Sequence, residues 1–206
     1  GYDTVESTIL AISASKVLSG PVAAYMLERG LLWQHSVAVA FGAQRIARDR
    51  EITPLSDAYV AGLLHDVGKL VLDLLVEHQS SWAGVVDRSL EARPWTEVER
   101  LVTGHDHAEV GAVLARSWNL PDRVVEAVAY HHAPGEAALS PELTSAVHLA
   151  NAAALMAGIG LGVDGLSSRL EGEAVERLHW SAQEMEKLIG EMQSSVSAAK
   201  EMLSVR

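Results

Sequence analysis

Cysteine is absent from the 206-residue chain, which excludes a disulfide-stapled scaffold and a metal site built on thiolates. Basic residues are scarce, since 16 Lys and Arg stand against 27 Asp and Glu, a formal net charge of −11. A protein that binds the phosphate backbone without sequence preference needs the opposite sign, so we expect no direct nucleic-acid binding. Hydrophobic residues still make up 49% of the chain, which excludes a disordered, highly charged segment.

Long apolar runs and an export leader are missing as well. The longest apolar run, residues 152–163, has twelve residues with three glycines among them, which is too short to span a bilayer. No charged-then-apolar leader opens the chain. We therefore expect no membrane segment and a cytoplasmic setting. The chain begins with Gly1 rather than Met, so we expect a fragment of a longer protein.

Helical periodicity runs through nearly the whole chain, and it predicts an all-α fold without strands or internal repeats. Helices are expected over about residues 31–50, 56–76, 107–118, 121–131 and 142–158, and the glycine-rich residues 158–165 are expected to form a flexible turn. Thr96 to Glu99 fits a capping box that opens a short helix, and Asp106 is the expected N-cap of the helix that follows it.

A final amphipathic helix is expected to begin near Ser181, because apolar residues recur there at alternating spacings of three and four. Such a stripe packs either on the body of the domain or on a second copy of the chain, and we favour the body. We divide the chain into a helical domain, residues 1–165, and a C-terminal helical extension, residues 166–206.

Polar side chains interrupt the apolar faces of several of these helices. They are His35, His65, Asp66, His107, His131, His132 and Asn151. Burying an unpaired polar group costs about 1–3 kcal/mol, and an unpaired carboxylate costs more, so we expect these groups to meet. Imidazole and carboxylate ligands suit iron, manganese, zinc or nickel, with magnesium as a further candidate.

We therefore expect one or two divalent ions at the place where these groups meet. Asp66 would bridge two ions, with His35 and His65 on one, and with His107, His131 and His132 on the other.

Six short stretches, taken together, match the motifs of a known family. They are LWQHS (32–36), AGLLHDVGK (61–69), GHDHAEVG (104–111), WNLP (118–121), the pair His131-His132, and VHLAN (147–151). The set resembles the HDOD domain, a bacterial signalling output module related to the HD superfamily of metal-dependent phosphohydrolases. The resemblance covers about residues 5–160, and the set is specific although each motif alone would be weak.

The resemblance implies a compact, multi-helix bundle of HD type. It also implies that the metal ligands of HD enzymes match His35, His65 and Asp66, and that the additional ligands of HD-GYP enzymes match His107, His131 and His132. Lys69 follows the HD pair as a lysine does in HD-GYP enzymes, where it approaches the substrate phosphate. Asp66 and Lys69 are therefore the candidate catalytic residues.

Two departures from the family pattern weaken the expectation of catalysis. Asn151 stands where the superfamily normally has an aspartate, and an amide oxygen can ligate a metal but brings no charge. After His132 the chain reads Ala133-Pro134-Gly135, without the Gly-Tyr-Pro element of the HD-GYP branch. The second departure removes support for hydrolysis of cyclic dinucleotides.

Purely structural explanations stand beside these assignments. Asp66 could cap a helix while His65 packs beside it, and Lys69 could reach solvent along its alkyl stem. Among the remaining histidines, His148 and His179 are expected in the core. His105 is expected in a turn and His78 on the surface.

Three functions remain open at this stage, and we favour the first. One is a regulatory output domain, coupled to a receiver or sensor domain in the same full-length chain. Another is an active metal-dependent phosphohydrolase acting on a nucleotide or a phosphodiester. The third is a scaffold that forms a homodimer through the C-terminal helix.

Overall fold

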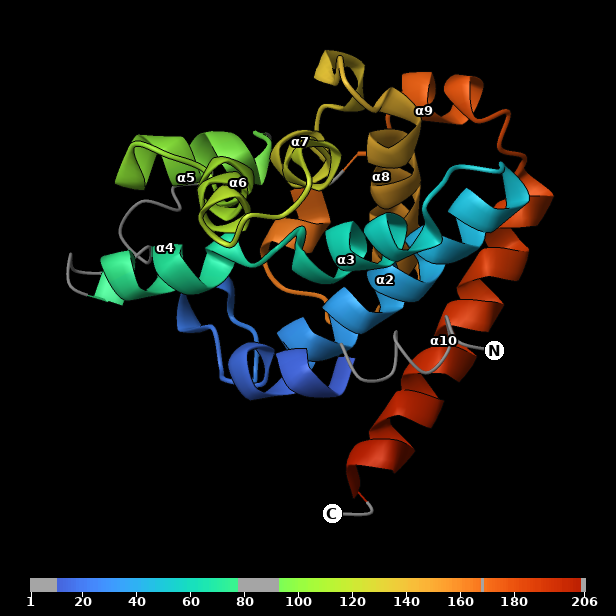
Figure 1. Ribbon diagram of the computed structural model, residues 1–206. Coiled ribbons are helices and arrows are strands. Elements are labelled where there is room, and N and C mark those ends of the chain that lie inside the picture. Colours follow the sequence, from blue (N-terminus) through green and yellow to red (C-terminus); the bar gives the residue numbers. More distant parts are fainter. Residues whose placement is uncertain (1–10, 78–92, 168, 205–206) are drawn as a thin grey trace.

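Residues 11–77, 93–167 and 169–204 are described by the computed structural model, and in these ranges the chain is helical without a β-strand (Figure 1). One isolated antiparallel bridge, between Val22 and Leu27, closes the turn that holds the 3-10 helix η1 (Ala23–Tyr25). The predicted all-α fold class is confirmed.

None of the helices in the described ranges combines the length and the apolar character that a membrane span requires.

Helix α2 (Leu31–Asp49) lies at the centre of the bundle. It packs against α3 (Leu55–Leu64), α8 (Pro141–Met156) and the C-terminal helix α10 (Ala182–Ser204). Much of its buried surface consists of alanine, including Ala38, Ala40, Ala43 and Ala47, and such small side chains let the neighbouring helices approach closely. The observed bounds of α2 and α8 agree with the predicted ranges to within two residues at each end.

A second group of helices packs beside this centre. Helix α6 (His107–Ser117) contacts both α4 (Gly68–Glu77) and α7 (Asp122–Tyr130), and α7 also contacts α3 and α8. The remaining short elements are α5 (Trp95–Thr103), which contacts α4; η3 (Pro134–Glu136); η4 (Asp164–Ser167); and α9 (Gly172–Arg177), which contacts α8 and η3.

The single helix predicted over residues 56–76 is wrong, because the chain breaks into α3 and α4 at residues 65–67. Backbone hydrogen bonds between residues three apart, such as Val67 N to Leu64 O and Lys69 N to Asp66 O, replace the helical pattern there. The apolar periodicity continues across the break, so the sequence pattern did not reveal it. The break turns His65 and Asp66 out of a regular helix.

Helix starts agree with the sequence at one of two predicted places. Asp106 accepts a hydrogen bond from Glu109 N at 2.8 Å, and the Glu109 side chain accepts one from Asp106 N, so the predicted N-cap of α6 is confirmed and forms a full capping box. The box predicted at Thr96 is wrong, since α5 begins after Pro94 without a side-chain cap. Glu99, the second half of that predicted box, is instead fully buried.

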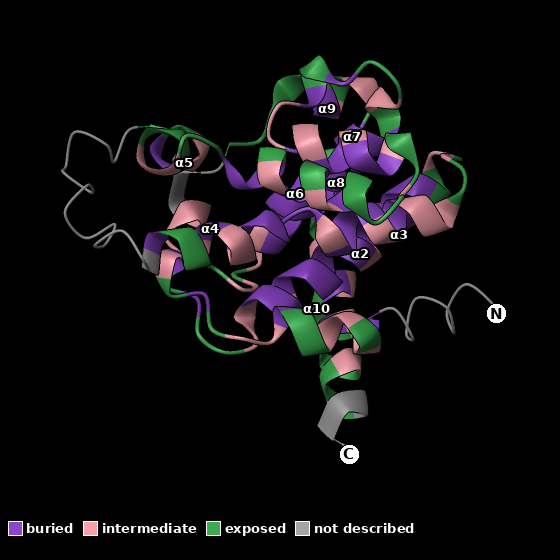
Figure 2. Cartoon of the chain, turned by 60° about the vertical axis from the view of Figure 1, so that its left-hand side comes forward, coloured by how far each residue is buried: buried purple, intermediate pink, exposed green. Residues whose placement is uncertain are grey.

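The predicted C-terminal helix is confirmed as α10, and it packs on the body of the molecule. Met185, Leu188, Met192 and Val196 are buried in one hydrophobic cluster with residues of α2, α3 and α8. Figure 2 shows buried residues on α2 and α8 and exposed ones toward the C-terminal end of α10. This core therefore joins residues from both sides of the predicted division at residue 165.

Candidate metal centre

Six of the predicted site residues converge at the junction of α2, α6 and two turns. His35 comes from α2, and His107 is the first residue of α6. His65 and Asp66 lie in the turn between α3 and α4, and His131 and His132 lie in the turn after α7. All but the half-buried His132 are buried.

The first cluster consists of His35, His65 and Asp66. The Nε2 atoms of His35 and His65 lie 3.6 Å and 3.4 Å from Oδ2 of Asp66. The two imidazole rings have centroids 5.2 Å apart.

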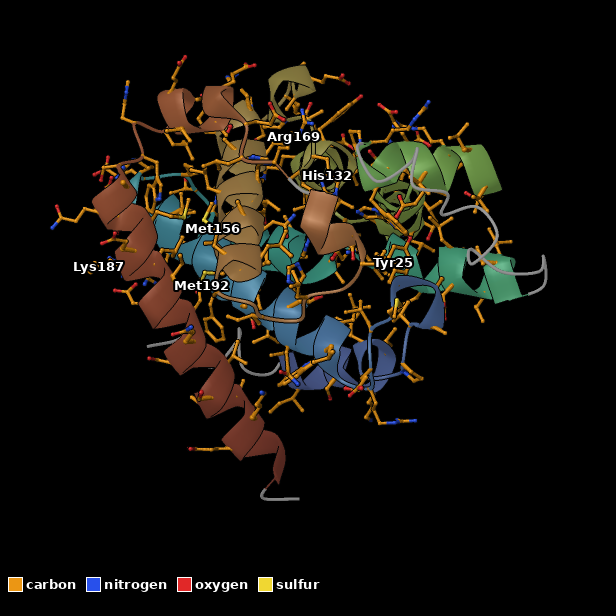
Figure 3. The ribbon with its side chains drawn as sticks, turned by 180° about the vertical axis from the view of Figure 1, so that it is seen from behind. Tyr25, His132, Met156, Arg169, Lys187 and Met192 are labelled. Atoms are coloured by element: carbon orange, nitrogen blue, oxygen red, sulfur yellow. The ribbon has the colours of Figure 1, made fainter. Side chains whose placement is uncertain are left out.

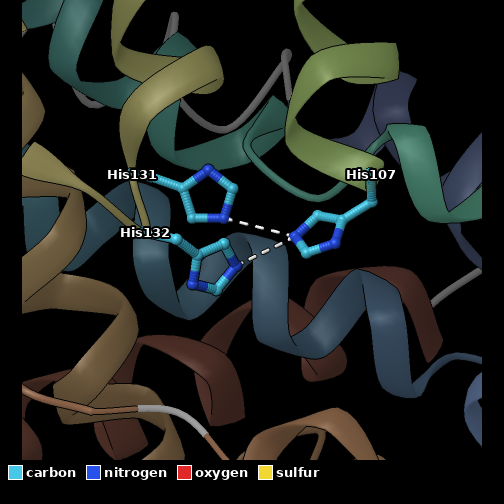
Figure 4. A group of neighbouring side chains, drawn as sticks. All are labelled: His107, His131 and His132. Atoms are coloured by element: carbon cyan, nitrogen blue, oxygen red, sulfur yellow. Dashed lines mark hydrogen bonds between the residues drawn. The ribbon is translucent and has the colours of Figure 1, made fainter. Parts of the chain in front are cut away.

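The second cluster consists of His107, His131 and His132, drawn in Figure 4. Nε2 of His107 lies 3.4 Å from Nε2 of His131 and 3.0 Å from Nε2 of His132. Oδ1 of Asp66 lies 3.3 Å from His107 Nε2 and 3.8 Å from His131 Nε2. Asp66 therefore faces the first cluster with one carboxylate oxygen and the second cluster with the other.

Four of the imidazoles are oriented by the acceptor that their Nδ1 atom meets. Three of them meet a backbone carbonyl oxygen: Nδ1 of His35 lies 3.0 Å from Ile159 O, Nδ1 of His65 lies 2.8 Å from Gly62 O, and Nδ1 of His131 lies 2.8 Å from Val128 O. The fourth, Nδ1 of His107, lies 2.8 Å from the carboxylate of Glu99. A carbonyl or carboxylate oxygen only accepts, so each Nδ1 carries the hydrogen and donates it. Each Nε2 then points its lone pair inward in the neutral ring, which is the arrangement of histidines that bind metals.

The centre of the site therefore holds more hydrogen-bond acceptor atoms than donor hydrogens that could satisfy them. Nε2 of His65, Oδ1 of Asp66 and Oδ1 of Asn151 are buried without a hydrogen-bond partner. Within each cluster one ligand atom per residue lies within 4.8 Å of the others, close to the separation of ligands that share an ion at about 2.0–2.2 Å. The residues present thus fit a divalent cation, and each cluster could bind a metal ion.

Burial and neighbouring charges shift the pKa values of these histidines in different directions. Burial lowers the pKa values of His131 and His132 well below the ordinary range, and neighbouring imidazoles lower them further. Burial also lowers the pKa of His35 to about 4. Burial alone would lower the pKa of His107, but the charge of Glu99 together with hydrogen bonding to Asp66 and Glu99 raises that pKa to about 10. Without a metal, His107 therefore holds a second proton, on the Nε2 atom that faces Oδ1 of Asp66, while His35, His131 and His132 stay neutral.

Glu99 is a site residue that the sequence analysis missed. Its carboxylate accepts hydrogen bonds from the backbone N of His107 at 2.9 Å, from His107 Nδ1, and from the Tyr25 hydroxyl at 2.7 Å. A carboxylate behind a histidine fixes the ring and raises its basicity toward a metal. A glutamate in a short amphipathic helix carries no sequence signal for this role, and the sequence analysis gave Glu99 the role of a capping-box residue.

Lys69 is buried, so the alternative in which it reaches solvent is wrong. Its Nζ donates to Oδ2 of Asp66 at 2.5 Å and to Oδ2 of Asp164 at 2.6 Å. The alternative in which Asp66 caps a helix is also wrong, because its two oxygens face imidazole nitrogens and this ammonium group.

Asp164 is the first residue of η4 and lies within the glycine-rich residues 158–165 that were expected to form a flexible turn. That turn is anchored on the site, because Ile159 O meets His35 and Val163 N donates to Tyr25 O at 3.1 Å. Gly160, at φ +62°, lies so close to α2 that an added Cβ would come within 2.6 Å of the His35 Cβ. The glycine is required there both by its backbone conformation and by the space.

A cavity of about 450 Å³ opens beside the two clusters. His35, His132 and Asn151 lie in its wall, so the structure brings Asn151 to the same cavity as the histidines. Arg100 and Arg169 also line it, and Figure 3 marks Arg169 and His132. Three basic side chains in the lining stand against five acidic ones, which disfavours an anionic ligand in the absence of a metal.

The other histidines divide between core and surface. His148 is buried, with Nδ1 2.7 Å from His131 O and with Nε2 accepting from Glu171 N at 2.9 Å, which confirms a satisfied core histidine. His105 is exposed beside the N-cap of α6, as predicted. The prediction for His179 is wrong, because it is exposed in a left-handed conformation at φ 46°. His78 lies outside the described residues.

The chain is similar in sequence to known proteins. A model of the HDOD domain family matches residues 1–134. Ribonuclease Y of Thermus thermophilus is 33% identical over 155 residues, which are 75% of this chain and 19% of that protein. The chain spans a quarter or less of the curated relatives that it matches, 25% and 19% of their lengths.

Two solved structures share the fold. An HDOD domain protein of unknown function from Geobacter sulfurreducens has a TM-score of 0.63 at 23% identity, over 93% of this chain and 72% of that one. A protein from Marinobacter aquaeolei VT8, named as a candidate signal transduction protein, has a TM-score of 0.65 at 22% identity, over 82% of this chain and 38% of that one.

Proposed function

The chain belongs to the HDOD domain family, and on that basis we propose that it is the output domain of a bacterial signalling protein whose metal-binding site serves regulation. The observation that carries this proposal is the inward convergence of imidazole Nε2 atoms on both oxygens of Asp66. So many buried acceptors in one place are costly unless a cation joins them.

The state of Lys69 favours regulation over turnover. In a phosphohydrolase this lysine would offer its charge to a substrate phosphate. Here its ammonium group is already bonded to Asp66 and Asp164, and it is buried. Asn151 supplies no charge to the site, and the excess of acidic side chains in the cavity lining opposes an anionic substrate.

Histidine-rich clusters favour iron, manganese, zinc or nickel over magnesium as the resident ion. A divalent ion bound there would polarise a phosphate oxygen and lower the pKa of a coordinated water. The residues that could hold an ion form two groups, His35 and His65 on one side of Asp66 and His107, His131 and His132 on the other, and Asn151 is available at the cavity wall.

The setting of the domain is part of the same proposal. We place it in the cytoplasm, within a longer chain that carries a receiver or sensor domain, as in a response regulator. The similarity to a candidate signal transduction protein supports this setting, as does the small share of the curated relatives that the chain spans. A homodimer and the absence of nucleic-acid binding stay predictions from the sequence.

A phosphohydrolase acting on a nucleotide or phosphodiester is the second candidate. It is favoured by the cavity beside both clusters, where Arg100 and Arg169 could meet a phosphate. The similarity to Ribonuclease Y points to a phosphodiester in that case.

Metal analysis combined with turnover assays separates the two functions. The protein would be loaded with Mn²⁺ or Fe²⁺ and tested on nucleotides and on a chromogenic phosphodiester. We expect bound metal without turnover. Turnover that Asp66→Ala abolishes while circular dichroism is unchanged would replace the regulatory function with the hydrolytic one. Absence of metal under every loading condition would remove the metal-dependent part of the proposal.

A further inference from the structure

We propose that this chain holds a single transition-metal ion, at His107, His131, His132 and Oδ1 of Asp66, and that the ammonium group of Lys69 occupies the place of a second ion beside His35 and His65. The inference rests on the proposed metal site and specifies how many ions it takes and where.

The two oxygens of Asp66 are in different states. Oδ2, which faces His35 and His65, is 2.5 Å from Nζ of Lys69. Oδ1, which faces His107 and His131, has no hydrogen-bond partner. A metal ligated by a carboxylate oxygen needs a lone pair at about 2.0–2.2 Å. Oδ1 is open on the side of the three histidines, whereas Oδ2 on the other side already accepts a hydrogen bond from the ammonium group of Lys69.

Lys69 is held in this position by more than one contact. Nζ also donates to Oδ2 of Asp164 at 2.6 Å and lies 5.4 Å from the centre of the Tyr25 ring. The backbone N of Lys69 donates to Asp66 O at 3.0 Å, so its main chain is tied to the same turn. The side chain is only 5% exposed, and leaving the site would break one buried and one partly buried ion pair. The ammonium group is therefore a fixed part of the first cluster.

The charges of the neighbouring side chains also favour an ion at the three-histidine cluster. Next to His35 and His65, the positive charge of Lys69 repels a divalent ion. Next to His107, the buried carboxylate of Glu99 lies behind the ring and attracts one. Asn151, at the cavity wall that includes His35, adds no compensating negative charge. Both geometry and charge thus favour the three-histidine cluster.

Cobalt loading tests the inference directly. The intact chain would be titrated with Co²⁺, with the visible absorption of the bound ion and the metal content after gel filtration as readouts. We expect one Co²⁺ per chain. His35→Gln should keep the ion, with an affinity within about threefold of the unsubstituted chain, whereas His132→Gln should lose it. Both substitutions keep a polar side chain of similar reach, so they form a matched pair.

Removing the lysine tests the exclusion. Lys69→Met should raise the content from one to two Co²⁺ per chain. Lys187→Met is the matched control, since Lys187 is exposed on α10 away from His132 (Figure 3), and it should leave the content at one. His179→Asn, at an exposed histidine, should also leave it at one. The histidine pair decides the position of the ion even where Lys69→Met does not fold.

The outcomes separate this inference from the proposed function. Two ions in the unsubstituted chain, or one ion that depends on His35 and not on His132, would overturn the single-ion assignment and leave metal binding intact. A folded Lys69→Met protein with one ion would overturn the role given to the lysine. No bound Co²⁺ in the unsubstituted chain would overturn both proposals.

Discussion

Gly68 is the position where a single methyl group should damage both the fold and the site. It is the first residue of α4, where that helix meets the start of α6. A Cβ added there would lie 2.0 Å from His107 O and 2.7 Å from Gly111 N. Both obstacles are backbone atoms, so no side-chain rotation relieves the contact. Gly68→Ala must therefore push α4 and α6 apart.

The size of the effect follows from that distance. Ordinary contacts between heavy atoms are about 3.5 Å, so the two backbones have to separate by more than about 1 Å. Overpacking of this kind costs about 1–3 kcal/mol, and a contact between two backbones belongs at the upper end. For a chain of this size a loss of about 3 kcal/mol lowers Tm by roughly 6–12 °C. The same displacement separates Asp66 from His107, so affinity for a metal should fall as well.

Thermal and urea unfolding measure the effect, and Gly190→Ala provides the control. Gly190 lies within α10, and an added Cβ there would meet nothing within 4 Å. Because alanine is the better helix former by about 1 kcal/mol, this substitution should raise Tm by roughly 2–4 °C. The two glycine substitutions are thus expected to act in opposite directions. A Gly68→Ala protein as stable as the unsubstituted chain would refute the close approach of α4 and α6.

Three further predictions concern single groups. Tyr25→Phe removes the buried hydrogen bond to Glu99 and should lower the free energy of unfolding by about 1.5–3 kcal/mol in urea, because the acceptor is charged; an unchanged midpoint would contradict that bond. In the Lys69→Met protein, Asn151→Asp should raise the affinity of the His35 side of the site for a divalent ion at least about tenfold in a calorimetric titration, and an unchanged affinity would place residue 151 outside the coordination sphere. Hydrogen bonds from Ser181 and Arg50 lower the pKa of Glu184 to about 2, so its contribution to stability is complete above the ordinary pKa near 4.5 and is lost as the pH falls toward 2. The difference in urea midpoint between Glu184→Gln and the unsubstituted chain should therefore be present at pH 7 and disappear near pH 2; a difference that persists there would contradict the lowered pKa.

Sequence periodicity was sufficient for the helices that carry regular apolar faces. The bounds of α2 and α8 were predicted to within two residues, and the start of α10 to within one, because apolar residues recur along each of them at helical spacing. The break at residues 65–67 was not predicted, because apolar residues continue on both sides of it. At the break, Asp66 meets His35, His107 and His131, which come from distant parts of the chain and which no local pattern reveals.

The candidate site likewise contains residues that the sequence predicted and residues that it did not. Histidines in apolar surroundings were conspicuous in the sequence, and the structure brings the motif residues together. Glu99 and Asp164 were not conspicuous, since each stands in a polar or glycine-rich stretch typical of a surface. Their place in the site depends on tertiary contacts with His107 and Lys69, which no local pattern encodes.

The ring of His148 connects the C-terminal part of the chain to the histidine pair. One ring nitrogen donates to the main chain at His131, and the other accepts from the main chain at Glu171, so a single neutral tautomer serves both ends. Any movement of the segment before α9 must therefore break a bond to the very side chain that supports His131. A displacement of that segment would therefore be transmitted to His131, and so to the metal centre, through the ring of His148.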